Sequence, residues 1–189
     1  GTWSYWQDKA WRDYFRGTSA HNTVMVDGAD QSVSGGPFMW LRKANTRIER
    51  TPQSAGQFDF CGSHDGYMRL PDPARHVREV KFDDAALTLT VSDRIEAKGV
   101  HRLEQFWHFA PGLEVKRTAR GVYVRGKAFG MDVVVSGEGA AIDLVRGQEN
   151  PPLGWYSRSY EAKQPCDVVK ITTDSSGAPL ECRFTISFS

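Results

Sequence analysis

One histidine stands where a side chain could bind a metal ion or a substrate. His21 follows a polar loop and precedes Thr23–Val26, a β-branched apolar run that predicts a short strand. Asp27-Gly28 then predicts a turn with a positive φ at the glycine. A strand would fix the imidazole, and the loop would leave one ring nitrogen accessible. The alternative is a histidine held by a structural hydrogen bond, and a single residue does not separate the two.

The other histidines are predicted to have structural or solvated positions. His64 precedes Asp65-Gly66 and either shapes a turn or pairs with Asp65, and the sequence favours the turn. His76 and His101 each adjoin an arginine at a predicted strand start, so we expect both to be solvated. His108 alternates with aromatic residues, which predicts an exposed side chain or one bonded to a backbone carbonyl. None has triad spacing with a serine or cysteine.

The cysteines form no recognisable metal or disulfide framework. Cys61, Cys166 and Cys182 are widely spaced and odd in number. Cys166 and Cys182 could pair if their strands were neighbours.

Composition excludes several classes of partner. The 189 residues carry a net charge of +1, so no global field recruits nucleic acid. No run approaches the ~18 apolar residues of a membrane helix, and the first residues do not resemble a signal peptide. Because the chain does not begin with methionine, we expect an internal fragment or a processed product. Its length predicts one domain, residues 1–189.

The elements that must position these residues are almost all strands. One short helix is predicted at residues 7–16, where Trp11, Tyr14 and Phe15 recur at helical spacing, with Asp8 as N-cap and Gly17 as stop. Short alternating runs separated by turns follow to residue 188, among them Tyr67–Leu70. This pattern predicts an all-β fold, an antiparallel β-sandwich with one short N-terminal helix; a barrel or jelly roll is the alternative.

Aromatic residues crowd the start of the chain. Three of the six tryptophans lie in the first eleven residues, and burying each such ring stabilises a fold by about 1.5–3 kcal/mol. We therefore expect this segment to pack, either on the chain's own sheet or on a neighbouring domain.

Several of these stretches together resemble a known family. Residues 1–5, 11–24 and 26–32 are similar to the C-terminal region of the heparinase II/III-like polysaccharide lyases, as are shorter stretches at 64–67, 107–111 and 154–157. The resemblance implies a supersandwich-like C-terminal β-sandwich whose N-terminal α/α toroid is absent from this chain. It also implies cleavage of uronate glycans by β-elimination, and a periplasmic, cell-surface or secreted bacterial protein.

The resemblance implies roles for particular residues. His21, in the Ala-His-Asn motif, matches one ligand of the family's zinc site, whose other ligands would lie before Gly1, so the site is incomplete here. Tyr5 lies near a catalytic tyrosine of alginate-cleaving relatives, with an interface aromatic as the alternative. Arg16 could meet a substrate carboxylate or make a structural contact. Asn22 and Trp6 are expected to bind substrate.

Three kinds of function remain open for this chain. The first is the sandwich half of a carbon-oxygen lyase acting on an acidic polysaccharide, inactive without its toroid. The second is a binding module that holds such a glycan through exposed tryptophans and arginines without chemistry. The third is a purely structural domain that stabilises the toroid.

Overall fold

A computed structural model describes residues 2–51, 53–54, 57–175 and 179–188. The chain divides into two compact units. The first comprises Gly1–Lys43, Arg102–Gly112 and Ala141–Thr172, and the second comprises Ala44–His101, Leu113–Ala140 and Thr173–Ser189. The expectation of one domain over residues 1–189 stays a prediction.

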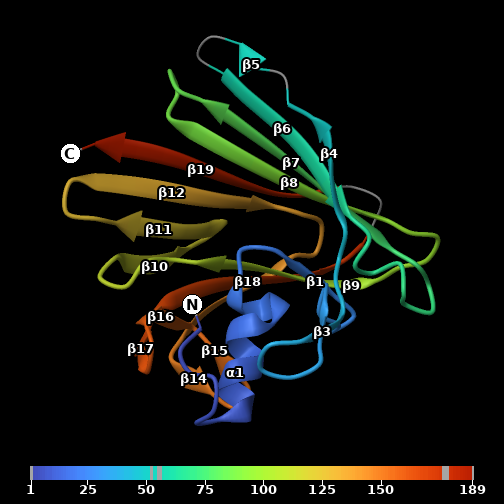
Figure 1. Cartoon of the computed structure of the whole chain (residues 1–189). Helices are drawn as coiled ribbons and strands as arrows, with labels where there is room; N and C mark the ends of the chain where they lie inside the picture. Colours follow the sequence, from blue (N-terminus) through green and yellow to red (C-terminus); the bar gives the residue numbers. More distant parts are fainter. Residues whose placement is uncertain (1, 52, 55–56, 176–178, 189) are drawn as a thin grey trace. The chain divides into compact units, whose positions relative to one another are not determined.

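The first unit combines a helix with a four-stranded sheet and three short hairpins (Figure 1). The sheet has the order β1-β9-β18-β13, in which β1 pairs antiparallel with β9 and β13 antiparallel with β18. Its elements are α1 (Lys9–Arg16), the 3-10 turn η1 (Thr18–Ala20), β1 (Val24–Val26), β2 (Val33–Ser34), β3 (Trp40–Arg42), β9 (Arg102–His108), β13 (Ala141–Arg146), β14 (Gln148–Glu149), β15 (Pro152–Leu153), β16 (Trp155–Ser159), β17 (Ala162–Pro165) and β18 (Asp167–Asp174).

The predicted N-terminal helix is confirmed. Asp8 is its N-cap, and the carboxylate accepts hydrogen bonds from the backbone N–H groups of Ala10 and Trp11. The helix ends at Gly17, whose N–H donates to the carbonyls of Asp13 and Tyr14. The cap and the stop residue both match the prediction from the sequence.

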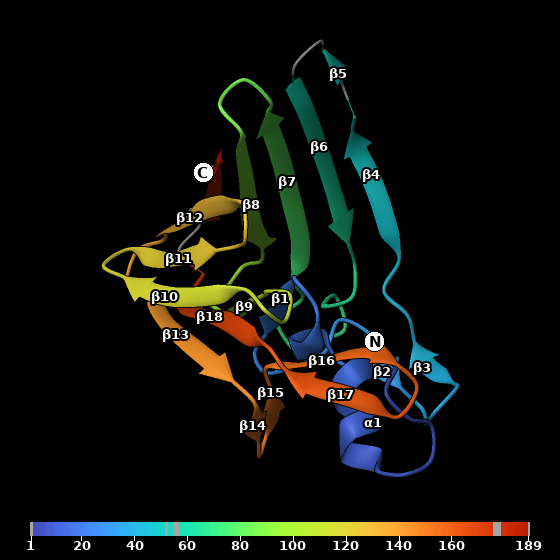
Figure 2. The ribbon, with the colours of Figure 1, turned by 90° about the vertical axis from the view of Figure 1, so that its left-hand side faces the viewer.

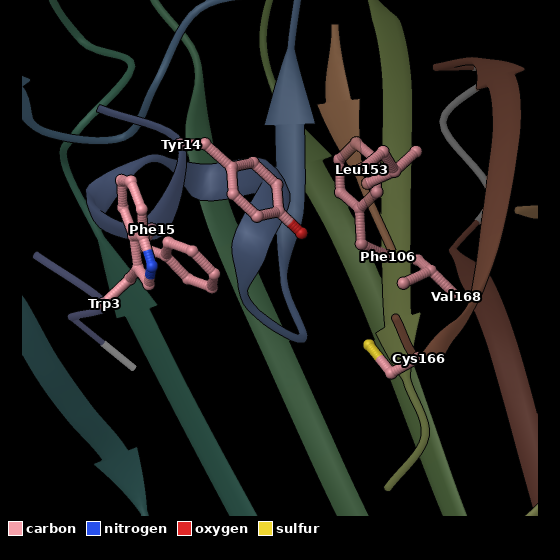
Figure 3. Packing of buried hydrophobic residues seen from close by; sticks show 7 residues of the cluster. All are labelled: Trp3, Tyr14, Phe15, Phe106, Leu153, Cys166 and Val168. Carbon is pink, nitrogen blue, oxygen red and sulfur yellow. The ribbon is translucent and has the colours of Figure 1, made fainter. Parts of the chain in front are cut away.

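The aromatic N-terminal segment packs within its own unit. Trp3, Tyr14 and Phe15 are buried in one cluster with β9, β15 and β18 (Figure 3). That cluster contains Trp3, Tyr14, Phe15, Phe106, Leu153, Cys166 and Val168, with Trp11 and Trp155 packed against it. Of the two alternatives left open by the sequence, these rings take the first, packing within the chain itself.

The second unit is an antiparallel sheet of nine strands in the described chain, several of which run side by side in Figure 2. The strand order is β10-β11-β12-β19-β8-β7-β6-β4, and β5 pairs with β6. These strands are β4 (Thr46–Arg50), β5 (Gln53–Ser54), β6 (Gln57–His64), β7 (Arg75–Asp83), β8 (Thr88–Glu96), β10 (Glu114–Thr118), β11 (Gly121–Arg125), β12 (Phe129–Ser136) and β19 (Leu180–Phe188).

A buried ionic network crosses three strands of this sheet. His76 Nε2 lies 2.6 Å from Asp93 Oδ1, and the Arg78 guanidinium donates to both oxygens of Asp93 at 2.7 Å. His76 Nδ1 in turn lies 2.9 Å from His64 Nε2, while His64 Nδ1 accepts from the Gly66 N–H. Arg78 is the main cause that holds the pKa of Asp93 below its usual range despite complete burial.

The structure corrects three expectations about this unit. His76 and His101 were predicted to be solvated, yet both are 3% exposed, because Asp93 and Asp72 lie beside them. Tyr67–Leu70 was predicted to be a strand, but these residues form turns. The turn role of His64 is confirmed by its bond from Gly66.

The structure also bears on the predicted fold class, on the cysteines and on membrane-spanning helices. The described chain is built of antiparallel strands and one short α-helix, so the all-β prediction is confirmed. Cys61, Cys166 and Cys182 are buried free thiols, so the pairing of Cys166 with Cys182 that the sequence left open does not form here. Within the described residues, no helix is both long enough and apolar enough to cross a membrane.

Candidate functional site

A cavity of about 370 Å³ in the first unit brings several predicted site residues together. We call it the arginine pocket. Tyr5, Arg16 and His21, three candidate site residues named from the sequence, line it, and so does Arg12, which was not among those candidates. Its full lining is Thr2, Tyr5, Arg12, Phe15, Arg16, His21, Pro37, Phe38 and Trp40.

The N-terminal segment is anchored in a way that positions Tyr5. Trp3 N–H donates to Ser157 Oγ at 3.0 Å, and Trp3 O accepts from the Glu161 N–H at 2.7 Å. The Lys163 ammonium lies 3.1 Å from the ring centroid of Trp11 and 5.0 Å from that of Trp3. These contacts tie residues 3–11 to the β16-β17 hairpin, so Tyr5 enters the pocket on a fixed backbone.

Tyr5 is stacked among aromatic rings. Its ring lies 4.9 Å from that of Phe38 and 5.7 Å from that of Tyr160, and the Arg12 guanidinium lies 4.9 Å from its centroid. Tyr14, by contrast, is a buried structural phenol: burial raises its pKa to about 12, and its oxygen accepts from the Trp155 N–H. Tyr5 is thus the phenol of this helical region that lines the pocket.

Arg16 is hydrogen-bonded to the loop that follows β2. Its guanidinium donates to the carbonyls of Gly36 (2.5 Å) and Met39 (2.9 Å) and lies 4.1 Å from the ring centroid of Trp40. The structural contact considered from the sequence is therefore present. A role in binding a substrate carboxylate stays a prediction.

His21 presents one nitrogen for binding. Its Nδ1 lies 2.8 Å from the Gly17 carbonyl, so Nδ1 donates and Nε2 keeps a lone pair on an exposed ring. A metal-ligating histidine typically has this arrangement, with the second nitrogen bonded to a carbonyl. Yet no group of three or more His, Cys, Asp or Glu side chains able to hold a metal occurs among the described residues. These residues alone do not complete a zinc site.

Asn22 and Trp6 lie outside the pocket lining. Asn22 Oδ1 accepts from the His108 backbone N–H at 2.8 Å and lies 3.1 Å from His108 Nδ1. Trp6 is 74% exposed, and its ring lies 5.5 Å from that of Phe38 at the pocket wall. Substrate binding by either residue stays a prediction.

Arg12 could have been found from helical spacing. Arg12 and Arg16 are four residues apart on a predicted helix, which places both side chains on one face. The contribution of Phe38 and Trp40 to the pocket could not have been predicted from the sequence. These residues reach the pocket from a loop and a short strand more than twenty residues further along the chain.

Acidification should destabilise this unit through His108. Burial, with a smaller contribution from His21, lowers the His108 pKa from 6.5 to about 4. The folded protein therefore binds fewer protons than the unfolded chain between these values, so stability falls as the pH drops from 6.5 to 4. We expect a loss of about 1–2 kcal/mol after allowance for partial exposure.

Urea unfolding at pH 7 and at pH 4.5, followed by tryptophan fluorescence, measures this loss. His108→Asn should reduce the difference between the two pH values, whereas His21→Asn, at an exposed ring, should leave most of it. An equal acid loss in wild type and His108→Asn would contradict the assignment.

Comparison with known proteins agrees with this arrangement. The antiparallel strands, the short helix and the pocket beside it define an all-β domain. The family model for the heparinase II/III-like C-terminal domain matches residues 1–185, and the chain belongs to this family. The family expected from the resemblance is thus confirmed. No curated protein matches the chain.

Solved structures show the same fold. A heparan sulfate lyase HepC mutant from Pedobacter heparinus superposes with a TM-score of 0.77 at 14% identity, covering 100% of this chain and 28% of that one. Two structures of the heparinase III BT4657 gene product, one with methylated lysines, give TM-scores of 0.76 and 0.75 at 15% identity, covering 100% of this chain and 27% of theirs. The β-sandwich prediction is confirmed, and the chain spans little more than a quarter of these proteins.

Proposed function

We propose that this chain is the C-terminal β-sandwich domain of a bacterial polysaccharide lyase that cleaves a uronate-containing glycan. The family match over residues 1–185 carries the proposal. Its structural neighbours, a heparan sulfate lyase and a heparinase III, support the substrate class. Because such glycans are extracellular, we expect the protein in the periplasm, at the cell surface or in the medium.

The proposed reaction is β-elimination. A base removes the C5 proton of the uronate, the C4–O bond to the leaving sugar breaks, and a C4=C5 double bond forms while an acid protonates the departing oxygen. Neutralising the uronate carboxylate makes the C5 proton more acidic. In this proposal the main tyrosine and histidine that move these protons belong to the N-terminal toroid.

The arginine pocket is proposed to form part of the wall of the substrate groove. Arg16 and Tyr5 offer cationic and phenolic donors to the glycan, and exposed Trp6 beside Phe38 offers an apolar face. Asn22, bonded to His108, would fix the backbone after His21. This chain alone is expected to be catalytically inactive.

A non-catalytic role in glycan binding is the second candidate. The observation that favours it is that Arg16 is bonded to two loop carbonyls, and Tyr5 packs against the rings of Phe38 and Tyr160 with no carboxylate or histidine among its contacts in the described residues. Such groups suit holding a sugar better than moving a proton. A domain that only stabilises the toroid would need neither.

Appearance of unsaturated uronate by ultraviolet absorbance tests the proposal. We would assay residues 1–189 and an N-terminally extended protein on alginate, heparan sulfate and related glycans. Activity in the extended protein alone is expected. Glycan binding by residues 1–189 without activity in either protein would favour the binding module.

We further propose that His21 supplies one ligand to a zinc ion in the longer protein, with the remaining ligands outside residues 1–189. The free Nε2 and the Nδ1 bond to Gly17 support it. Metal analysis of the longer protein should find zinc in the wild type and at least a tenfold loss of affinity in His21→Ala. Equal zinc content in both, with unchanged thermal unfolding, would remove the assignment.

A further inference from the structure

Two guanidinium groups face the arginine pocket from one side of α1. Arg12 and Arg16 lie one helical turn apart, and both line the cavity. Arg12 Nη2 donates to the Pro37 carbonyl at 2.6 Å, next to the carbonyls of Gly36 and Met39 that bind Arg16. The same loop therefore holds both side chains in place.

Aromatic rings fix the guanidinium planes. Arg12 lies over Tyr5 and Arg16 over Trp40, at 4.9 and 4.1 Å from the ring centroids. A guanidinium held on one edge by a carbonyl and on one face by a ring loses little further entropy when it binds a ligand. The pocket is thus preorganised.

The positive charge in this pocket has no acidic counterpart. No Asp or Glu is among the lining residues, and neither guanidinium forms an ion pair within the described part of the chain. Burial, and then repulsion by Arg16, lower the Arg12 pKa, against weaker attraction by Tyr5 and Asp13. Two like charges at one cavity favour an anion between them.

Donors for such an anion remain available. A guanidinium has five N–H groups; the bonds to loop carbonyls use one on Arg12 and two on Arg16. The Nε of Arg12 is buried with no hydrogen-bond partner among the described atoms. A buried donor without a partner is costly, which a bound acceptor would relieve.

We propose that the arginine pocket is a subsite for one anionic group on a sugar residue, a carboxylate or a sulfate, and that Arg12 determines the preference for charged sugars. The inference rests on the proposed function for its glycan ligand. A volume of about 370 Å³ is at the small end for ligand sites and suits one sugar residue with its charged group. In this proposal the side chains of Tyr5, Phe38 and Trp40 form the walls that face the apolar part of the sugar ring.

Calorimetric binding to the full-length protein that contains this chain tests the subsite. Three oligosaccharides of equal length serve as probes: an unsulfated uronate glycan, its carboxyl-reduced N-sulfated counterpart, and neutral maltohexaose. Wild type should bind one or both anionic probes, more weakly at high salt, and should not bind the neutral one measurably. The two anionic probes distinguish carboxylate from sulfate recognition.

Variants of Arg12 decide whether the arginine contributes. Arg12→Gln should weaken anionic binding by about 10- to 100-fold, as expected for a lost charge-assisted hydrogen bond. Arg12→Lys keeps the charge and a donor for Pro37 but lacks the planar fork, and it should weaken binding severalfold even if Arg12→Gln fails to fold. Arg117→Gln, at an exposed residue on β10 outside the pocket, should bind as wild type.

The outcomes separate this inference from the proposed function. Wild-type affinity in both folded Arg12 variants, or equal affinity for maltohexaose, would overturn the subsite even if the protein is an active lyase. Loss of anionic binding in the Arg12 variants of a protein that forms no unsaturated product would support the subsite and refute the lyase proposal.

Discussion

Replacing Asp93 by asparagine should lower the free energy of unfolding by about 3–5 kcal/mol, the range for breaking a buried ion pair from one side. Asp93 is 1% exposed and faces His76 and the largely buried Arg78. Asparagine keeps the shape of the side chain and one acceptor. It removes the charge that balances the Arg78 guanidinium, so an uncompensated cation would remain inside the sheet.

Urea unfolding followed by far-ultraviolet circular dichroism measures this change. Asp132→Asn is the matched control, because Asp132 is an exposed residue on β12 of the same sheet and should change stability by no more than about 0.5 kcal/mol. Similar unfolding curves for Asp93→Asn and the control would show that the buried network does not stabilise the fold.

Phe106→Ala should have a comparable effect on the first unit. Phe106 is 1% exposed on β9 and belongs to the cluster that contains Trp3, Phe15 and Val168; Figure 3 shows it beside Leu153 and Val168. Removing a buried phenylalanine ring leaves a cavity and costs about 3–5 kcal/mol. Phe38→Ala, at a 63% exposed ring, should cost about 1 kcal/mol or less.

Tryptophan fluorescence is the probe for this variant, because all six tryptophans lie in the first unit. A Phe106→Ala midpoint equal to that of Phe38→Ala would contradict the assigned core. The same two probes test the prediction of one domain: a single cooperative domain requires each variant to shift fluorescence and circular dichroism together. Separate shifts would show that the two units unfold independently.

The sequence correctly predicted the elements that depend on neighbouring residues, which are the helix α1 and the turn at Gly28. Asp8 caps the start of α1 and Gly17 ends it, as predicted. Gly28 adopts a positive φ of 69°, as expected for its turn. The spacing of Tyr14 and Phe15 correctly identified the buried face of the helix. The prediction of a strand at Tyr67–Leu70 was wrong, because a run of four mixed apolar and polar residues is as compatible with a turn as with a strand.

The buried histidines could not be predicted, because their partners are distant in sequence. His76 is paired with Asp93, which lies seventeen residues away in the sequence. The adjacent arginine had instead favoured a solvent-exposed position for this histidine. The candidate site divides in the same way. His21 followed from its local motif, and Tyr5 and Arg16 were named with the family resemblance. The contributions of Phe38 and Trp40 to the pocket depend on where the chain returns after β2.

Analysis of the cleavage products by mass spectrometry tests the central claim most directly. The N-terminally extended protein would digest its preferred uronate glycan, and the new non-reducing ends would be identified. Elimination predicts that each cleavage yields one fragment whose new non-reducing end is an unsaturated uronate, one water lighter than the corresponding hydrolysis fragment, and one fragment with an ordinary new reducing end. A saturated uronate at the new non-reducing ends, or no cleavage of any uronate glycan, would contradict the proposal that this chain is a domain of a polysaccharide lyase.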